Sequence, residues 1–174
     1  MRPLKRVEYD RMVDLGLFAS ERVELLYGAL VQRTPQGGQH AYLLVQLNKL
    51  FVSALGDRAD VRLQMPLAAT EDSEPEPDLA IVPPGLREHP KSALLVIEVA
   101  DSSRQKDRGL KTGLYAAAGI PEYWVIDLVE KVVEVRTDPE RGRYKSLATV
   151  EQGKLSPKAF PDIQVDVGAL LGRG

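Results

Sequence analysis

Apolar residues recur at helical spacing in four stretches of the chain. Over residues 40–55 they return every three or four positions, which predicts an amphipathic helix that ends at Gly56. Shorter patterns predict helices over residues 5–15 and 167–171, and a longer one predicts a helix over residues 104–118. The apolar residues expected on the inner side of that last helix are Leu110, Leu114, Ala117 and Ala118.

The stretches between these helices have the patterns of β-strands. Residues 22–26 and 29–32 flank Tyr27-Gly28 and predict a hairpin, with the glycine supplying the turn. Residues 93–100 form a nearly continuous apolar run, which is typical of a strand buried on both faces. The other predicted strands are residues 59–65, 77–82 and 123–127, and residues 131–136 and 144–150 as antiparallel edge strands.

The order of these elements predicts the fold class. The strand at residues 93–100, the helix at 104–118 and the strand at 123–127 have the spacing of a βαβ crossover, so the two strands are expected to be parallel. The sequence therefore predicts an α/β (α+β) fold, a mixed β-sheet core flanked by helices. A chain of 174 residues fits a single domain over residues 1–174.

Composition excludes several classes of protein. The chain has no cysteine, which excludes disulfides, thiolate metal sites and a cysteine nucleophile. Its apolar runs are far shorter than the roughly 20 residues that span a bilayer, and the basic N-terminus lacks the apolar region of a signal peptide. We therefore expect a cytoplasmic protein without a membrane partner. The net charge of −2 argues against nonspecific coating of nucleic acid but permits contacts with a few phosphates.

Three acidic residues lie in or beside predicted strands. Glu98 interrupts the most apolar strand, where an unpaired carboxylate would cost several kcal/mol, so it needs a partner or a metal ion. A structural salt bridge would satisfy it equally well. Asp78 begins a strand directly after Pro77, a position that a turn or cap residue also takes. Glu24 lies between apolar residues in the early hairpin, where strand alternation could simply point it at solvent.

Carboxylates that converge at strand positions would favour Mg²⁺ or Mn²⁺, which prefer hard oxygen ligands. A nearby lysine would orient the attacking water or neutralise charge on a phosphate. Lys111, in the predicted helix after the Glu98 strand, is the candidate. An ordinary ion pair with Asp107, four residues earlier, would explain this lysine equally well.

Two short motifs carry a family resemblance. Pro77-Asp78 followed by Glu98-Val99 resembles the PD-(D/E)XK nuclease pattern, although Ala100 stands where the common form has lysine. The strings at residues 95–103 and 119–127, with Lys111 and Tyr115 between them, resemble the Uma-two family of restriction endonucleases. So does the string at residues 24–30, and the resemblance extends over nearly the whole chain.

This resemblance implies a restriction-endonuclease-like fold and a Mg²⁺-dependent endonuclease that hydrolyses DNA. It implies that Asp78, Glu98 and the Val99 carbonyl bind the metal ion, that Lys111 is the catalytic lysine and that Glu24 is an outer acid of the same site. It also implies a homodimer. The alternative is a non-catalytic module of the same fold that binds nucleic acid or protein.

Other polar and aromatic residues are expected to have structural roles. His40 is expected to be structural or to lie behind the site, and Gln64 is only a weak candidate to face it. We expect His89 to be exposed, Asp127 to serve a turn, and the aromatic pair Tyr123-Trp124 to lie in the core.

Overall fold

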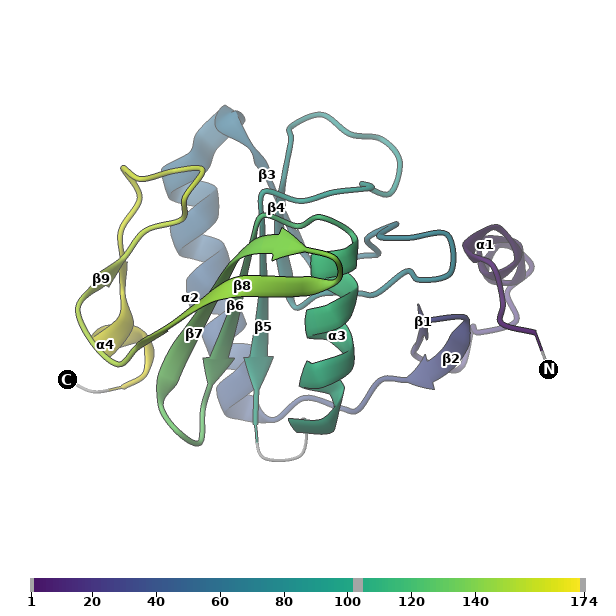
Figure 1. Ribbon diagram of the computed structural model, residues 1–174, viewed down its shortest axis with the longest axis horizontal. Helices are drawn as coiled ribbons and strands as arrows, with labels where there is room; N and C mark the ends of the chain where they lie inside the picture. Colours follow the sequence, from purple (N-terminus) through teal and green to yellow (C-terminus); the bar gives the residue numbers. More distant parts are fainter. Residues whose placement is uncertain (1, 102–104, 173–174) are drawn as a thin grey trace.

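A six-stranded mixed sheet forms the centre of the computed structural model, which describes residues 2–101 and 105–172, without the side chains of residues 105–108. The strands lie in the order β3-β4-β5-β6-β7-β8, and β5 and β6 are parallel while every other neighbouring pair is antiparallel (Figure 1). Their bounds are Asp60–Leu63 for β3, Leu79–Val82 for β4, Leu95–Ala100 for β5, Glu122–Asp127 for β6, Val132–Glu140 for β7 and Arg143–Val150 for β8.

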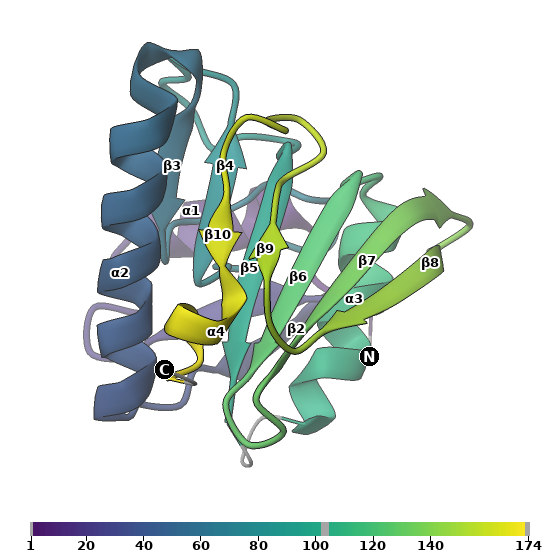
Figure 2. The same ribbon diagram turned by 90° about the vertical axis from the view of Figure 1, so that its left-hand side faces the viewer.

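Helices cover both faces of this sheet. Helix α2 and the C-terminal segments β9, β10 and α4 lie over one face, and α3 lies over the other (Figure 2). The helices are α1 (Arg6–Asp14), α2 (Gly38–Leu55), α3 (Gln105–Ala117) and α4 (Val167–Leu170), with a 3₁₀ turn at Gly56–Arg58; the short strands are β1 (Val23–Leu26), β2 (Ala29–Gln32), β9 (Lys154–Leu155) and β10 (Val165–Asp166). None of the described helices is long and apolar enough to cross a bilayer.

The alternation of side chains along β5 divides the core into two layers. Leu95, Ile97 and Val99 belong to the apolar cluster beneath α2. Val96 and Ala100 belong to the cluster beneath α3. Successive strand residues point to opposite faces, so Glu98, between Val99 and Ile97, faces α3.

The N-terminal helix and hairpin form a separate edge of the molecule. Helix α1 and strands β1 and β2 lie beyond α3, at the right-hand end of Figure 1. The hairpin is held by the segment between β3 and β4: the Gly28 amide donates to the Asp72 carbonyl over 2.7 Å, and the Tyr27 amide donates to Ser73 Oγ over 2.8 Å. Leu25 pairs with Glu74 in an isolated β-bridge. Residues far apart in the sequence therefore meet beside α3.

The predicted helices, the hairpin, the βαβ crossover and the mixed sheet are confirmed. The inner face predicted for α3 is confirmed for Leu114, which is fully buried, and for Ala118, which packs against the core, but it is wrong for Leu110, which is 51% exposed, and for Ala117, which is also exposed. Lys111 and Tyr115 are buried beside Leu114. The helix is turned so that its lysine reaches the sheet, since Lys111 forms ion pairs there.

The edge position predicted for β7 is also wrong. β7 lies between β6 and β8, and only β8 ends the sheet on that side. The strand continues to Glu140 and pairs along both of its edges, with β6 over residues 132–137 and with β8 over residues 133–140. The short strands β9 and β10, which cover the α2 face, were not predicted.

Candidate active site

Asp78 and Glu98 lie opposite each other on neighbouring strands. The antiparallel register pairs Leu79 with Ile97, so the next position along β4 and β5 brings Asp78 across from Glu98. Pro77 has no backbone N–H, which suits the residue just before a strand. The Val99 amide donates to Asp78 Oδ2 over 2.9 Å and fixes the carboxylate at the end of β4. Both acids follow from the strand pattern of the sequence.

Asp78 is held by groups from three other elements. Its side chain is 1% exposed, and Oδ2 lies 3.1 Å from Nε2 of His40 on α2. A terminal nitrogen of Arg33 lies 3.9 Å from Oδ1. Burial raises the pKa of Asp78, but the His40 contact, the Val99 amide and the Lys111 charge outweigh it and hold the pKa below its ordinary value. Asp78 is therefore a carboxylate at neutral pH.

Glu98 is held through one of its two oxygens. Its Oε1 accepts hydrogen bonds from Lys111 Nζ at 3.1 Å and from the Tyr115 hydroxyl at 2.8 Å. Burial, with the nearby charges of Asp78 and Glu24, raises the pKa of Glu98 to about 7, although the Lys111 charge and the Tyr115 hydrogen bond act to lower it. Among the described residues, both of these hydrogen bonds end on Oε1.

Lys111 lies between two carboxylates from different parts of the chain. Its Nζ is 3.1 Å from Glu98 Oε1 and 3.1 Å from Glu24 Oε2, and Glu24 also accepts the Glu76 amide at 3.0 Å. Burial lowers the pKa of Lys111, but Glu98 and Glu24 outweigh it and raise the pKa above its ordinary value. The side chain of Asp107 lies outside the described residues, so the alternative ion pair is not visible.

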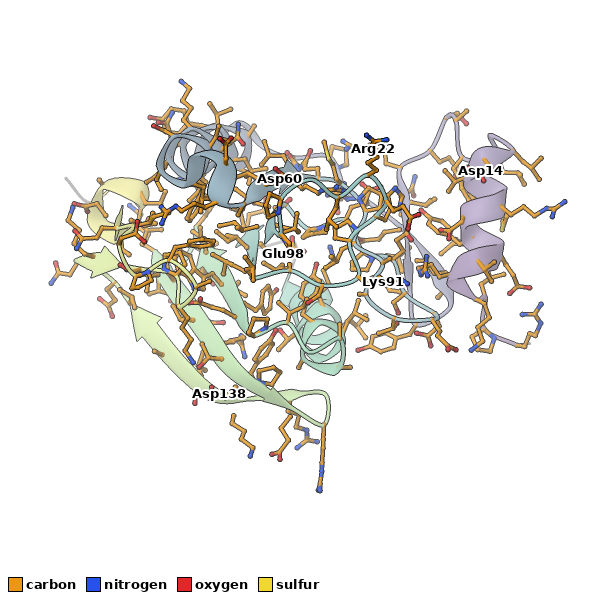
Figure 3. The ribbon with its side chains drawn as sticks, turned by 90° about the horizontal axis from the view of Figure 1, so that it is seen from above. Asp14, Arg22, Asp60, Lys91, Glu98 and Asp138 are labelled. Carbon is orange, nitrogen blue, oxygen red and sulfur yellow. The ribbon has the colours of Figure 1, made fainter. Side chains whose placement is uncertain are left out.

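Glu24, Asp78, Glu98 and Lys111 line one open pocket, whose empty space of about 570 Å³ includes open solvent at its mouth. The remaining lining residues come from β2 and the segment after it, from the end of β5 and from β6: Val31, Gln32, Arg33, Thr34, Val99, Ala100 and Tyr123. Glu98 lies near the middle of the molecule, whereas Asp14 and Asp138 lie at its margins (Figure 3). The pocket therefore gives solvent access to an acid deep within the fold.

The donor set fits a divalent cation shared with a substrate. Among residues 2–101 and 105–172, no group of three or more His, Cys, Asp or Glu side chains is arranged as a metal site. Mg²⁺, however, commonly takes one or two carboxylates and completes its shell with waters and substrate phosphate oxygens. Asp78 and Glu98 provide that pair of hard oxygen donors in a solvent-accessible pocket.

Three residues at the site were not assigned there from the sequence. His40 was expected to be structural or to lie behind the site, and the signal for the second role was its place on the buried face of α2, because a buried polar group needs a partner. Tyr115 follows Lys111 by four residues and so shares its helix face. Arg33 follows the end of β2 and carried no recognisable signal.

The remaining expectations concern residues around the site. Gln64 does not line the pocket, although its backbone N–H donates to the backbone carbonyl of Asp78 over 3.2 Å. Asp127 accepts the amides of Val129 and Glu130 and serves a turn, as predicted. His89 is exposed, and Tyr123 and Trp124 are core residues, also as predicted.

Comparison with known proteins gives one family and one fold. The family model described as "Uma2: Putative restriction endonuclease" matches residues 7–168. A crystal structure of a putative nuclease belonging to DUF820 from Anabaena variabilis ATCC 29413 is similar, with a TM-score of 0.79 at 15% identity over 98% of each chain. No curated protein was found to match.

Proposed function

The chain belongs to the Uma2 family, and on this premise we propose that it is a nuclease that hydrolyses DNA phosphodiester bonds within the strand, with Mg²⁺ or Mn²⁺ bound at Asp78 and Glu98. The observation that carries the proposal is the pair of facing carboxylates with a buried lysine between Glu98 and Glu24, at the base of an open pocket. Burying a carboxylate costs free energy of desolvation, even when an opposite charge pairs with it. Buried acids of this kind are therefore found most often at functional sites.

Each side chain has a distinct role in this proposal. Asp78 and Glu98 hold the metal ion, and the Val99 carbonyl is a further ligand. When bound, the ion lowers the pKa of a water and stabilises charge on a phosphate. His40 and the Val99 amide position Asp78, and Tyr115 positions Glu98.

Lys111 acts in this proposal as a cation rather than as a base. The two neighbouring carboxylates raise its pKa, so it stays protonated at neutral pH and cannot take a proton from water. It can donate a hydrogen bond to a phosphate oxygen and neutralise the charge that builds up there. Glu24 also contacts the ammonium group, with Oε2 3.1 Å from Nζ, and so helps to hold it in place.

The proposed function is tested by cutting of supercoiled plasmid and single-stranded DNA with Mg²⁺ or Mn²⁺. We expect wild type to cut, and Asp78→Asn, Glu98→Gln and Lys111→Gln each to lose at least about 100-fold in rate, since each removes a charge at the reacting centre. EDTA should abolish cutting by wild type. Circular dichroism would confirm that each variant is folded.

Glu122→Gln is the matched control. Glu122 is a buried glutamate in β6, bonded to Trp124 Nε1 and the Lys158 amide, and it does not line the pocket. It should cut like wild type. Equal residual cutting by the site variants would indicate a contaminant, and absence of cutting by wild type with every metal and substrate would favour a non-catalytic binding module.

A further inference from the structure

A second hollow adjoins the active-site pocket. It is lined by residues 20–22, which precede β1, and by residues 32–36, which lead from β2 to α2. Gln32, Arg33 and Thr34 line both hollows, so the second hollow, called the groove below, adjoins the pocket along these residues. A substrate that enters the pocket has this groove beside it.

The side chains of the groove have the chemistry of a phosphate-binding surface. Arg22 and Arg33 outnumber the one acid, Glu21, in a chain whose net charge is −2. The other lining residues are hydroxyl and amide side chains together with one proline. Arginine, hydroxyl and amide groups make most protein contacts to the sugar–phosphate backbone. None of the described residues that line the groove is aromatic, so they offer no platform on which a base would stack.

Arg33 lies where the groove meets the pocket. Its side chain is 11% exposed, and one terminal nitrogen donates to Glu76 Oε2 while the other lies 3.9 Å from Asp78 Oδ1. These acids fix the orientation of the guanidinium group. The hydrogen bond to Glu76 uses one of the five N–H donors of an arginine, so others can meet a phosphate.

Arg22 lies farther out along the same groove. Its side chain is at the outer surface, well away from the central Glu98 (Figure 3). Its carbonyl accepts the Arg33 amide over 2.8 Å, so the two arginines are joined through their backbones. Together they mark a line that runs from the pocket to the surface.

We propose that this groove binds the sugar–phosphate backbone of the polynucleotide strand that is cut, with Arg33 at the phosphate nearest the pocket and Arg22 at one farther out. This inference rests on the proposed function, because it extends the same site along its substrate. It assigns a binding role to two arginines that the sequence patterns did not single out.

Fluorescence anisotropy of a labelled single-stranded oligodeoxynucleotide, and of its RNA counterpart, tests the proposal. Binding is measured at several salt concentrations, in EDTA and separately in Ca²⁺, with wild type, Arg22→Gln, Arg33→Gln and Arg143→Gln. We expect Kd for the preferred oligonucleotide to rise about tenfold in each groove variant, and the slope of log K against log salt to fall by about 0.7 for each lost contact.

Arg143→Gln is the control for lost surface charge. Arg143 is exposed in the β7–β8 hairpin, whose Asp138 lies on the opposite side of the molecule from Arg22 (Figure 3). It should retain the wild-type Kd and slope. Arg22→Gln keeps the test valid if Arg33→Gln is poorly folded, because Arg22 is exposed.

Two further outcomes separate the groove from the proposed function. If wild type binds and cuts while both groove variants keep its Kd and salt slope, the groove assignment is wrong and the proposed function stands. If wild type binds neither oligonucleotide under either condition and cuts neither, both are overturned.

Discussion

Lys111 illustrates how a costly residue can be held inside this fold. Removing an ammonium group from water costs several kcal/mol, and the cost is offset only where opposite charges and hydrogen bonds surround the group. Glu24 and Glu98 each contact Nζ at 3.1 Å. Removing the lysine would leave both acids buried without the positive charge that they share, although Tyr115 and the Glu76 amide would still donate hydrogen bonds to them. Lys111 therefore supports the fold as well as the proposed chemistry.

Tyr9 should make the stability of the fold depend on pH, and this effect can be measured without an activity assay. It is buried in α1, and its hydroxyl donates to the Val23 carbonyl over 2.9 Å. Burial, together with the nearby acids Glu76, Glu74 and Glu24, raises the pKa of Tyr9 to about 12. The folded state thus favours the neutral phenol, and stability should fall as pH rises from the unfolded pKa of about 10 toward 12.

Urea unfolding of wild type and Tyr9→Phe between pH 8 and 12 measures this effect. At pH 8 the variant should be less stable by roughly 0.5–1.5 kcal/mol, because it lacks the hydrogen bond. The difference should shrink as pH approaches 12, since phenylalanine cannot ionise. A difference that stays constant across this range would contradict the raised pKa.

At the scale of elements, the β1–β2 hairpin brings Glu24 to the site. Gly28 in its turn has φ +74°, and a Cβ there would collide with Pro3 and come within 2.9 Å of the Leu4 nitrogen. Gly28→Ala should cost roughly 1–2 kcal/mol for the left-handed conformation, plus about 1–3 kcal/mol for the collision. Thermal or urea unfolding would measure the loss.

Gly142 provides a matched control for backbone strain. Its φ is +73°, but a Cβ there would meet nothing closer than 3.9 Å. Gly142→Ala should therefore lose only the stability that the left-handed conformation costs a residue with a Cβ, roughly 1–2 kcal/mol. Equal losses in the two variants would show that residues 3–4 give way freely and do not brace the hairpin.

Helices and strands were predicted correctly where their formation depends on residues that are close together in the sequence. The spacing of apolar residues predicted α2, and the nearly continuous apolar run predicted β5, because each pattern depends on residues close in sequence. The face of α3 was predicted only in part: Leu114 lies inward as expected, but apolar spacing also places Leu110 inward, whereas it is Lys111 that lies inward, where it forms ion pairs with Glu24 and Glu98.

The site was predictable only in part for the same reason. Asp78 and Glu98 interrupt or begin apolar strands, so each stood out locally. Arg33 lies on an irregular segment, where no periodicity tells which way a side chain points. Its position depends on Glu76 and Asp78, which are brought to it only by the folded chain.

At the scale of the whole molecule, the pocket gathers residues from distant parts of the chain into an acidic centre. Three carboxylates and two cationic side chains line it: Glu24, Asp78, Glu98, Arg33 and Lys111. The excess of carboxylates favours a divalent cation, while the adjoining groove has an excess of arginine over acid. A negatively charged pocket suited to a cation thus lies beside a positively charged groove suited to a phosphate backbone.

The claim on which the account depends is that Asp78 and Glu98 bind a divalent metal ion. Electron paramagnetic resonance of free Mn²⁺, titrated with protein, tests it most directly. Wild type and Glu122→Gln should reduce the free-ion signal equally, and Asp78→Asn and Glu98→Gln should weaken binding at least about tenfold, as expected when a carboxylate ligand is lost. Equal uptake of Mn²⁺ by all four proteins, or none by wild type, would contradict the account.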